Sequence, residues 1–307
     1  MSHGPRGKMS TAGAIAAIDL GKTRCRLLMS GDSGHVVRAG DGTPGLAAPD
    51  GVEAAAESIL ALLDPGPMPH SLGVGAAGAW TAPAAARELA ETLAAETGAA
   101  VAVASDVVAA HIGALGGAPG VLLIAGTGAV ALGVDSEGIR LVDGWGPDIG
   151  DFGSGSWLGR EAIRAVQRAA VGLGPSTALE DAVAAHIAPA SDPLSWTLAQ
   201  HPLPRALATL APLVLDCAEQ GDAVALEIAS EAIRLLTASA VAASASAGEV
   251  ALHGGLTEHA WFRARLADAL SSADRRVATA VGDALTGAQL LMTRRDLPHE
   301  RFVHRAE

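Results

Sequence analysis

The sequence predicts an α/β protein made of two duplicated domains, and three observations support this prediction. The order strand, glycine-containing loop, strand, turn, strand begins near Gly13 and begins again at Gly120. Strand-like and helix-like segments alternate between the two copies, which is typical of sheets with parallel strands. The length of 307 residues is enough for about two domains.

Each copy is predicted from short apolar or alternating runs separated by turn residues. The segments of the first copy are a strand over 13–19, a loop over 20–23, a strand over 24–29, a turn over 31–34 and a strand over 35–39. The segments of the second copy are a strand over 120–125, a loop over 126–128, a strand over 129–134, a turn over 135–138 and a strand over 139–142. Five elements rarely recur in the same order by chance, so the repeat indicates duplication.

The remaining elements follow from apolar periodicity, with Pro83 in a first helical turn and Gly98 as a stop. Helices are predicted over 52–63, 83–97, 107–115, 157–171, 178–187, 205–219, 223–246, 261–270 and 284–292, and further strands over 71–75, 100–104 and 249–252. The predicted boundaries are a disordered leader over 1–11, a first domain over 12–117, a second over 118–283, a final helix over 284–294 and a charged tail over 295–307 that frays.

Composition and charge argue against several classes of function. The formal net charge is −12, whereas a nucleic acid or an anionic membrane would require a basic face. Cys25 and Cys217 stand far apart, without the spacing of a metal site or a redox motif. The stretch over 235–248 is too short and too rich in serine to span a bilayer, and a signal peptide is not recognisable. We therefore expect a cytoplasmic protein that binds a small molecule, and ATP is compatible with the acidic balance.

Two glycine-rich runs predict loops that bind a ligand. Gly126, Thr127 and Gly128 form the first run, and the second covers 144–155. Glycine lets backbone N–H groups approach a charged ligand with no Cβ in the way. The functional interpretation is a phosphate on the first run and a hydroxylated substrate on the second, which contains Asp151. Hairpin turns are the structural alternative for either run alone.

Two aspartates stand at the ends of predicted strands, at the edge where open α/β sheets bind ligands, and Lys22 stands in the loop after the first of these strands. Asp19 could hold a hydrated Mg²⁺ beside phosphates, or simply form a turn. Lys22 is the only lysine besides Lys8 and could point at the phosphates of ATP, or lie on the surface. Asp106 could act as a general base on a substrate hydroxyl, or as the N-cap of the helix at 107.

Four segments resemble the sugar kinase, heat-shock protein and actin superfamily. Residues 18–24 (IDLGKTR) resemble its first phosphate loop, residues 124–128 (IAGTG) its second, and residues 253–256 (HGGL) its adenosine loop. Taken alone, the last segment is equally a hairpin corner. Ser105 and Asp106, together with 144–155, are similar to the N-acetylglucosamine kinase branch, which is grouped with the BadF/BadG/BcrA/BcrD ATPases. The resemblance covers nearly the whole chain, about 15–292.

The resemblance implies two RNase H-like (actin-like ATPase) domains with an interdomain active-site cleft and a final helix that packs back on the first domain. It implies an ATP-dependent kinase that phosphorylates the 6-hydroxyl of an amino sugar, N-acetylglucosamine or glucosamine, with Asp106 as catalytic base and Asp19 beside Mg²⁺. The residues expected at ATP are Gly21, Lys22, Thr23, Gly126, Thr127, Gly128, Gly254 and Gly255. The residues expected at the sugar are Asp106, Thr127, Gly144, Trp145 and Asp151. A homodimer is expected on the same ground.

The sequence departs from the family pattern in ways that leave the sugar open. The loop over 40–45 has no asparagine, residues 75–78 lack a serine found in some relatives, Lys22 stands where a glycine is usual, and Phe152 replaces a common glutamate. Phosphoryl transfer is compatible with these changes. Two alternatives are an ATPase that activates a partner enzyme by redox coupling, and a non-catalytic sugar sensor.

Overall fold

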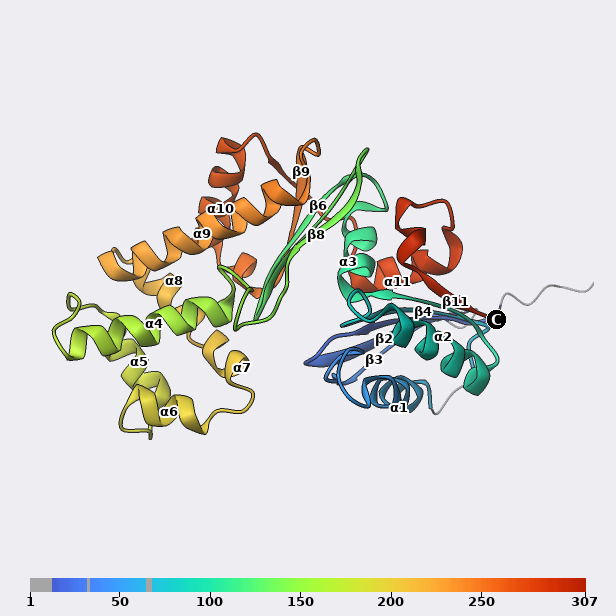
Figure 1. Ribbon diagram of the computed structural model, residues 1–307, viewed down its shortest axis with the longest axis horizontal. Helices are drawn as coiled ribbons and strands as arrows, with labels where there is room; N and C mark the ends of the chain where they lie inside the picture. Colours follow the sequence, from blue (N-terminus) through green and yellow to red (C-terminus); the bar gives the residue numbers. More distant parts are fainter. Residues whose placement is uncertain (1–12, 32–33, 65–67) are drawn as a thin grey trace, which may run out of the picture. The chain divides into compact units, whose positions relative to one another are not determined.

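The computed structural model describes residues 13–31, 34–64 and 68–307, and the chain forms two compact units. The first unit contains the chain up to Gly117 and, after a return, Val281–Glu307. The second unit is Ala118–Ala280 (Figure 1). The return at Val281 comes three residues before the start of the final segment expected from the sequence. The leader expected over 1–11 and the centre of the turn expected over 31–34 lie outside the described residues.

The first unit is built on a six-stranded sheet in the order β11-β5-β4-β1-β2-β3. Its strands are β1 Ile15–Leu20, β2 Arg24–Gly31, β3 Gly34–Asp41, β4 Ser71–Ala76, β5 Ala100–Ser105 and β11 His304–Ala306. Short connections make β1, β2 and β3 an antiparallel meander. Helical crossovers bring β4 parallel to β1 and β5 parallel to β4.

The second unit repeats this arrangement in a five-stranded sheet of order β10-β9-β6-β7-β8. Its strands are β6 Gly120–Ala125, β7 Ala129–Asp135, β8 Gly138–Asp143, β9 Glu249–His253 and β10 Arg276–Ala278. Three antiparallel strands again adjoin two strands that run parallel to the first of them. The duplicated α/β fold predicted from the sequence is therefore confirmed.

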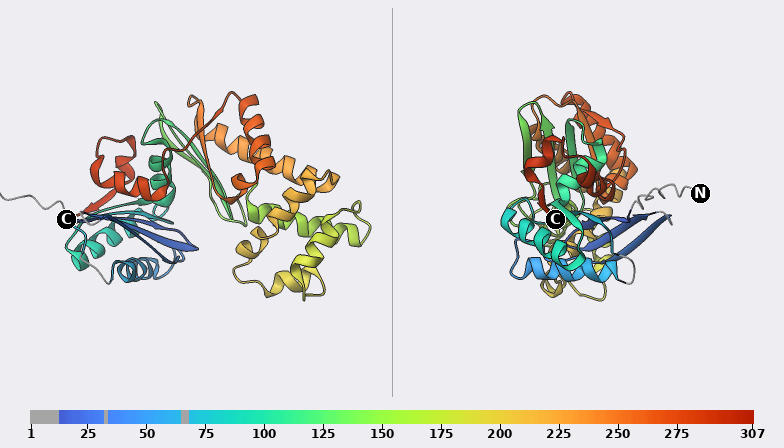
Figure 2. Two further views of the ribbon diagram at one scale, coloured as in Figure 1. Left: turned by 180° about the vertical axis from the view of Figure 1, so that it is seen from behind. Right: turned by 90° about the vertical axis from the view of Figure 1, so that its right-hand side faces the viewer.

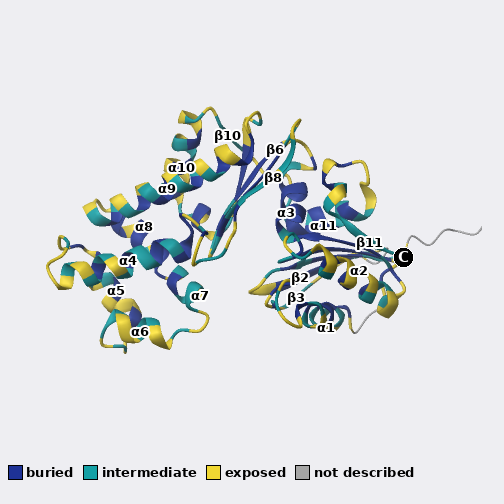
Figure 3. Ribbon diagram, viewed as in Figure 1, coloured by how far each residue is buried: buried dark blue, intermediate teal, exposed yellow. Residues whose placement is uncertain are grey.

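Helices cover both faces of the sheet in the first unit (Figures 1 and 2). They are α1 Gly51–Leu63, α2 Pro83–Thr97, α3 Asp106–Leu115 and α11 Ala284–Thr293. Side chains alternate along β1, so Ile18 and Leu20 join the core with α1 and α2. Ala17 points to the other face and packs against Leu285 and Ala288 of α11. The central strands β1, β4 and β5 are mostly buried, whereas the edge strand β3 is mostly exposed (Figure 3).

Helices α3 and α11 approach each other closely because glycine stands at their contact. A Cβ on Gly287 would overlap the carbonyl oxygen of Ala109 in α3. A Cβ on Gly113 would likewise overlap the carbonyl oxygen of Asp283, which precedes α11. Because backbone cannot yield as a flexible side chain can, this contact fixes α11 against the helix that begins with Asp106.

We expect Gly287→Ala to destabilise the protein by about 1–3 kcal/mol, because the added methyl group forces two packed helices apart. Urea unfolding followed by circular dichroism measures the change. Gly248→Ala is the matched control, since a Cβ there meets open space. Equal midpoints for the two variants would contradict the close packing of α3 and α11.

The second unit contains seven α-helices within its described residues. They are α4 Gly155–Ala170, α5 Leu179–Ile187, α6 Pro193–Ala199, α7 Leu203–Ala208, α8 Ala211–Glu219, α9 Ala223–Ala243 and α10 Ala260–Ser272. Phe262 of α10 is the largest fully buried side chain and lies in the core shared with β6 and β9. Along the described residues, no helix combines the length and the hydropathy that a bilayer span requires.

The single helix predicted over 205–219 is wrong, because α7 ends at Ala208 and α8 begins at Ala211. Pro212 has no N–H to donate to the carbonyl of Ala208, and its ring would collide with that carbonyl in a continuous helix. The chain therefore passes through tight turns at Thr209 and Leu210. The sequence prediction also lacks α6, although Asp192 and a proline at its first position are ordinary start signals.

The frayed tail predicted over 295–307 is also wrong. Residues Pro298–Phe302 form a short 3₁₀ helix, and β11 pairs with β5. The many charges suggested a solvated segment, but Arg305 makes two hydrogen bonds to Glu300 at 2.7 Å. Phe302 stacks on Trp80, with 4.4 Å between the ring centroids. Paired charges and a few anchoring apolar groups thus hold this segment on the first unit.

Candidate functional site

Three parallel strands of the first unit end at the same level. The register aligns Leu20 of β1 with Ala76 of β4, and Ala76 with Ser105 of β5. The turn after β1 and the start of α3 therefore lie at one edge of the sheet. Asp19, in β1, and Lys22 both influence the pKa of Asp106 electrostatically, so the structure brings these three predicted residues together.

The turn between β1 and β2 is fixed by its backbone. The N–H of Gly21 donates to the carbonyl of Arg24 at 2.9 Å, and the carbonyl of Gly21 accepts from the N–H of Thr43 at 3.2 Å. Lys22 and Thr23 are exposed at the tip of this turn. The predicted phosphate loop is thus a rigid hairpin that presents a cation and a hydroxyl to solvent.

Asp106 is the first residue of α3 but not its N-cap. Ser105 takes that role, since its Oγ accepts from the N–H of Val108 at 3.2 Å. The structural alternative for Asp106 is therefore wrong. The Oδ1 atom of Asp106 accepts from the N–H of Val107 at 2.9 Å.

The environment of Asp106 suits a general base. The pKa of Asp106 is raised to about 6. Burial is the largest cause, the Val107 N–H and Lys22 act to lower the pKa, and Asp19 acts to raise it. A carboxylate with this pKa is mostly ionised at neutral pH and still basic enough to accept a proton from a hydroxyl in a transition state. Strongly shifted carboxylates of this kind are frequent at catalytic sites.

Asp19 is held by an arginine that the sequence reasoning missed. Arg26 of β2 donates from Nε and Nη2 to Oδ2 of Asp19, at 3.0 and 2.7 Å. Its Nη1 donates to Oδ2 of Asp283 at 2.8 Å. Both bonds to Asp19 use the same oxygen. No local signal reveals this network, because Asp283 is 257 residues away from Arg26 in the chain.

A magnesium ion fits this edge only as part of a nucleotide complex. Among the residues the structure describes, no group of three or more His, Cys, Asp or Glu side chains could hold a metal ion. Mg²⁺ commonly keeps several waters and takes one or two carboxylates together with phosphate oxygens. Asp19 fits that pattern through the oxygen that Arg26 does not use.

In the second unit the glycine loop after β6 is tied to the start of α4. Gly126 accepts from the N–H of Gly155 at 2.8 Å, and Thr127 accepts from the N–H of Ser156 at 3.1 Å. Gly254 has a φ of 101°, and a Cβ there would overlap the backbone at 125–126. Only glycine allows this close approach, which brings the predicted loops at 126–128 and 254–255 together.

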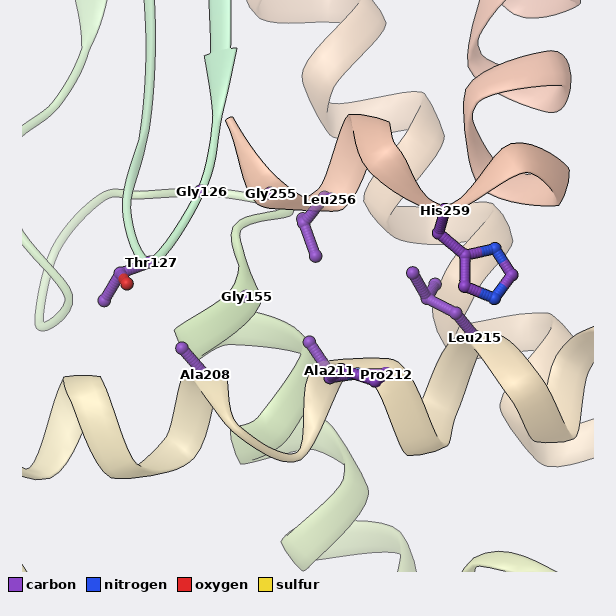
Figure 4. A pocket seen from close by; sticks show the side chains of 10 residues that line it. All are labelled: Gly126, Thr127, Gly155, Ala208, Ala211, Pro212, Leu215, Gly255, Leu256 and His259. Carbon is purple, nitrogen blue, oxygen red and sulfur yellow. The ribbon is translucent and has the colours of Figure 1, made fainter. Parts of the chain in front are cut away.

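A pocket of about 300 Å³ opens beside these loops in the second unit (Figure 4). Small and apolar groups dominate its walls, which are formed by Gly126, Thr127, Gly155, Ala208, Ala211, Pro212, Leu215, Gly255, Leu256 and His259. Thr127 lies at one end, and Leu215 and His259 lie at the other. The break between α7 and α8 supplies one wall. An apolar hollow that begins at glycine amides suits a planar base attached to phosphates.

His259 is a second residue that the sequence reasoning missed. Its Nδ1 accepts from the N–H of Phe262 at the start of α10, and its Nε2 lies 3.2 Å from Oδ1 of Asp216 in α8. These two contacts fix the ring at the end of the pocket. A histidine just before an apolar helical run is a weak cap signal, which explains why the sequence did not identify it.

The second glycine-rich run is shaped by Asp143, at the end of β8. Its two carboxylate oxygens accept from the N–H groups of Asp151 and Phe152 at 2.7 and 2.8 Å. Asp151 in turn accepts from the N–H of Ala129 at 3.3 Å, and a Cβ on Gly128 would come within 3.0 Å of its carboxylate. Asp151 therefore lies beside the 126–128 loop, as expected.

The remaining predicted sugar residues lie on the same run. Gly144 and Trp145 follow Asp143, and the indole of Trp145 is exposed and meets Phe152 edge-on at 6.4 Å. Arg160 of α4 donates to the carbonyl of Pro147 at 2.8 Å and holds the middle of the loop. The loop therefore combines a carboxylate with an exposed aromatic edge, two groups that often contact sugars.

The profile of the BadF/BadG/BcrA/BcrD ATPase family matches residues 18–289, which is most of the chain. The chain belongs to this family. Membership of this ATPase family supports ATP as the nucleotide.

The chain is similar to N-acetyl-D-glucosamine kinase of Dictyostelium discoideum, with 34% identity over 136 residues. That match spans 42% of each chain, so it covers less than half the length of this relative. A protein of Chromobacterium violaceum proposed to be an N-acetylglucosamine kinase has a similar crystal structure, with a TM-score of 0.74, 26% identity and coverage of 92% of this chain and 99% of that one.

A similarly proposed kinase of Porphyromonas gingivalis has a TM-score of 0.69 at 17% identity, with coverage of 90% of this chain and 98% of that one. At that identity the similarity shows the fold alone. Together these structures show that the chain has the fold of these proposed sugar kinases.

Proposed function

We propose that this ATPase-family protein transfers a phosphoryl group from ATP to the 6-hydroxyl of an amino sugar, N-acetylglucosamine or glucosamine. The observation that carries the proposal is Asp106, a partly buried carboxylate with a pKa of about 6 at the first position of α3, a helix whose N-cap is the neighbouring Ser105. The activities given for the Dictyostelium and Chromobacterium relatives support the same reaction.

In this proposal the nucleotide base occupies the apolar pocket of the second unit, against Gly255 and His259. The phosphates contact the backbone at Gly126, Thr127 and Gly128, with Gly254 as the close support of that loop. The first unit contributes Gly21, Lys22 and Thr23 to phosphate binding and Asp19 to Mg²⁺. When bound, Mg²⁺ supplies charge neutralisation on the transferring phosphate.

The sugar is bound by Thr127, Gly144, Trp145 and Asp151, with the Asp151 carboxylate accepting hydrogen bonds from its hydroxyl groups. Asp106 accepts the proton of the reacting hydroxyl as that oxygen attacks the γ-phosphate. Transition states of this reaction are loose, so positioning and charge neutralisation supply much of the acceleration. Asp143 contributes indirectly by shaping the loop that carries Asp151.

The reaction is tested by measuring ADP release from ATP and Mg²⁺ with a panel of hexoses, amino sugars and N-acylated sugars. We expect release above background with N-acetylglucosamine or glucosamine, and phosphorus NMR of the product should place the ester at the 6-position. ATP hydrolysis that no sugar stimulates would contradict the proposal. We also propose a homodimer, which analytical ultracentrifugation tests directly.

The two cysteines do not support the alternative of an ATPase that activates a partner enzyme by redox coupling. Cys25 and Cys217 are both buried, and burial raises the pKa of the Cys25 thiol to about 11. A thiol that resists ionisation is a poor cluster ligand.

The nucleotide pocket yields a prediction of its own. We expect Ala208→Leu to weaken ADP binding by about tenfold, because the larger side chain would occupy part of the pocket proposed for the base. A tenfold loss corresponds to about 1.4 kcal/mol of binding free energy. Ala206→Leu is the matched control, since Ala206 is on the same helix but does not line the pocket. Isothermal titration calorimetry gives both affinities, and equal values would place the nucleotide elsewhere.

A further inference from the structure

We propose that Arg26 is a positioning residue for Asp19, and that it fixes this carboxylate to the start of α11. The inference rests on the proposed function, because it assigns Asp19 to the nucleotide-borne Mg²⁺. It adds two residues that the sequence motifs do not indicate: Arg26 and its second partner, Asp283.

The geometry of the guanidinium carries the proposal. Arg26 places Nε and Nη2 on one oxygen of Asp19 and Nη1 on Asp283, so three of its nitrogens are used in fixed directions. Partial burial alone would lower the pKa of Arg26, but the two carboxylates raise it above its usual value, so the group stays charged. A planar fork of this kind restrains both partners more than a flexible ammonium group would.

Asp283 serves two elements at once. Its Oδ1 accepts from the N–H groups of Leu285 and Thr286 at 3.1 and 3.2 Å and caps α11, while its Oδ2 accepts from Arg26. Burial alone would raise the pKa of Asp283, but these donors lower it below its usual value. The cap of α11 is therefore bonded, through one guanidinium, to the carboxylate of β1.

The same helix end also supports Asp106. Gly113 of α3 packs against the backbone of Asp283, and Gly287 packs against Ala109. The start of α11 therefore holds both carboxylates of the first unit. It holds Asp19 through the ion pairs of Arg26, and it holds Asp106 through the close packing of α11 against α3. That support begins two residues after Val281, where the chain returns from the second unit.

The fork also determines what Asp19 can bind. Because Arg26 occupies Oδ2, one oxygen remains in a defined direction for a cation or its water. Two carboxylates and one guanidinium leave the cluster with a single net negative charge, so water and phosphate oxygens must supply most ligands of a divalent cation here. Partners that orient a metal-binding group in this way typically change metal affinity or activity by 10–100-fold when mutated.

The test is Arg26→Lys, which keeps the charge but cannot form all three bonds. We expect affinity for Mn²⁺·ADP, followed by the electron paramagnetic resonance of free Mn²⁺, to fall on the order of tenfold. Affinity for ADP without metal should stay within about twofold, because the base pocket is in the second unit. Arg87→Lys, an exposed arginine of α2, is the matched control and should leave both affinities unchanged.

Asp283→Asn gives an independent measurement, since its Oδ1 can still cap α11 while the charge facing Arg26 is lost. We expect a smaller loss in the same direction, and the double variant should lose less than the sum because the two residues act through one network. Parental Mn²⁺·ADP affinity in both single variants would overturn the proposal. Equal losses with and without metal would also overturn it, by showing a merely structural role. If the parent protein phosphorylated no sugar, the proposed function would be wrong. The comparison of Mn²⁺·ADP affinities between the parent and its variants would still test the role of Arg26.

Discussion

Asp106→Asn is expected to lower kcat for sugar phosphorylation on the order of 10²–10⁴-fold, the usual contribution of a general base. Asparagine preserves the shape and can still accept from the N–H of Val107, so the start of α3 should not change. The affinities for ADP and sugar should stay near parental values, because the lost interaction belongs to the transition state. Steady-state kinetics and titration calorimetry separate these quantities.

The pH dependence gives a second readout of the same residue. With a pKa of about 6 for Asp106, kcat/KM of the parent should fall as pH drops below about 6, since the protonated carboxyl cannot accept a proton. The residual activity of Asp106→Asn should not show this limb. Asp64→Asn, an exposed aspartate that follows α1, is the control and should keep the parental profile. A parental kcat in Asp106→Asn would remove this residue from the role of base.

Asp106→Asn should lower the activity of the protein but should not lower its stability at neutral or higher pH. Folding raises the pKa of Asp106 from 3.8 to about 6, so the folded protein holds this proton more tightly than the unfolded chain. The ionised carboxylate therefore costs stability as pH rises through this range, and the full cost is present above about 6. We expect Asp106→Asn to melt no lower than the parent at pH 8 and to lose that relative advantage below about pH 4. A loss of activity with unchanged or higher melting temperature excludes unfolding as its cause.

Local chemistry explains which parts of the fold could be predicted. Helix α2 was recoverable to the residue because Pro83 and Gly98 mark its ends. The repeat of strands and turns indicated the duplicated sheets because hairpins join neighbours in sequence. The signal for the helix break, Pro212, was also local. The prediction missed it because the apolar pattern of 205–219 favoured one continuous helix. The tail was not predictable in this way, since β11 pairs with a strand that lies about 200 residues earlier in a chain of 307.

In the candidate site, too, residues with local sequence signals could be predicted and residues with distant partners could not. Asp19, Asp106 and Asp151 stand at strand ends or in glycine-rich loops, where the residue types alone indicate chemistry. Arg26 and His259 could not be found because their partners come from distant segments. For Asp106 the sequence could not exclude the role of N-cap. Excluding it required the hydrogen bond from the N–H of Val108 to Ser105, which shows that the neighbouring serine is the N-cap.

Asp143→Asn is expected to lower kcat/KM for the sugar on the order of 100-fold without changing ADP affinity more than about twofold. Asp143 is buried, has a φ of 64° and accepts two backbone N–H groups, from Asp151 and Phe152. An amide offers one acceptor and turns its NH₂ toward the other N–H, so one bond is lost and a repulsion replaces it. Asparagine tolerates this φ, which separates the hydrogen bonds from backbone strain.

The loss should appear mainly in the KM for the sugar, because the carboxylate of Asp151 moves with its backbone while Asp106, in the first unit, is untouched. Unfolding measurements should show a cost of about 1–3 kcal/mol for the N–H left without a partner. Asp148→Asn is the control, an exposed aspartate of the same loop that should leave the KM unchanged. If Asp143→Asn kept the parental KM for every sugar that the parent phosphorylates, the 144–155 loop would not be the sugar site, since a substrate held by Asp151 must respond when the peptide that carries it loses its anchor.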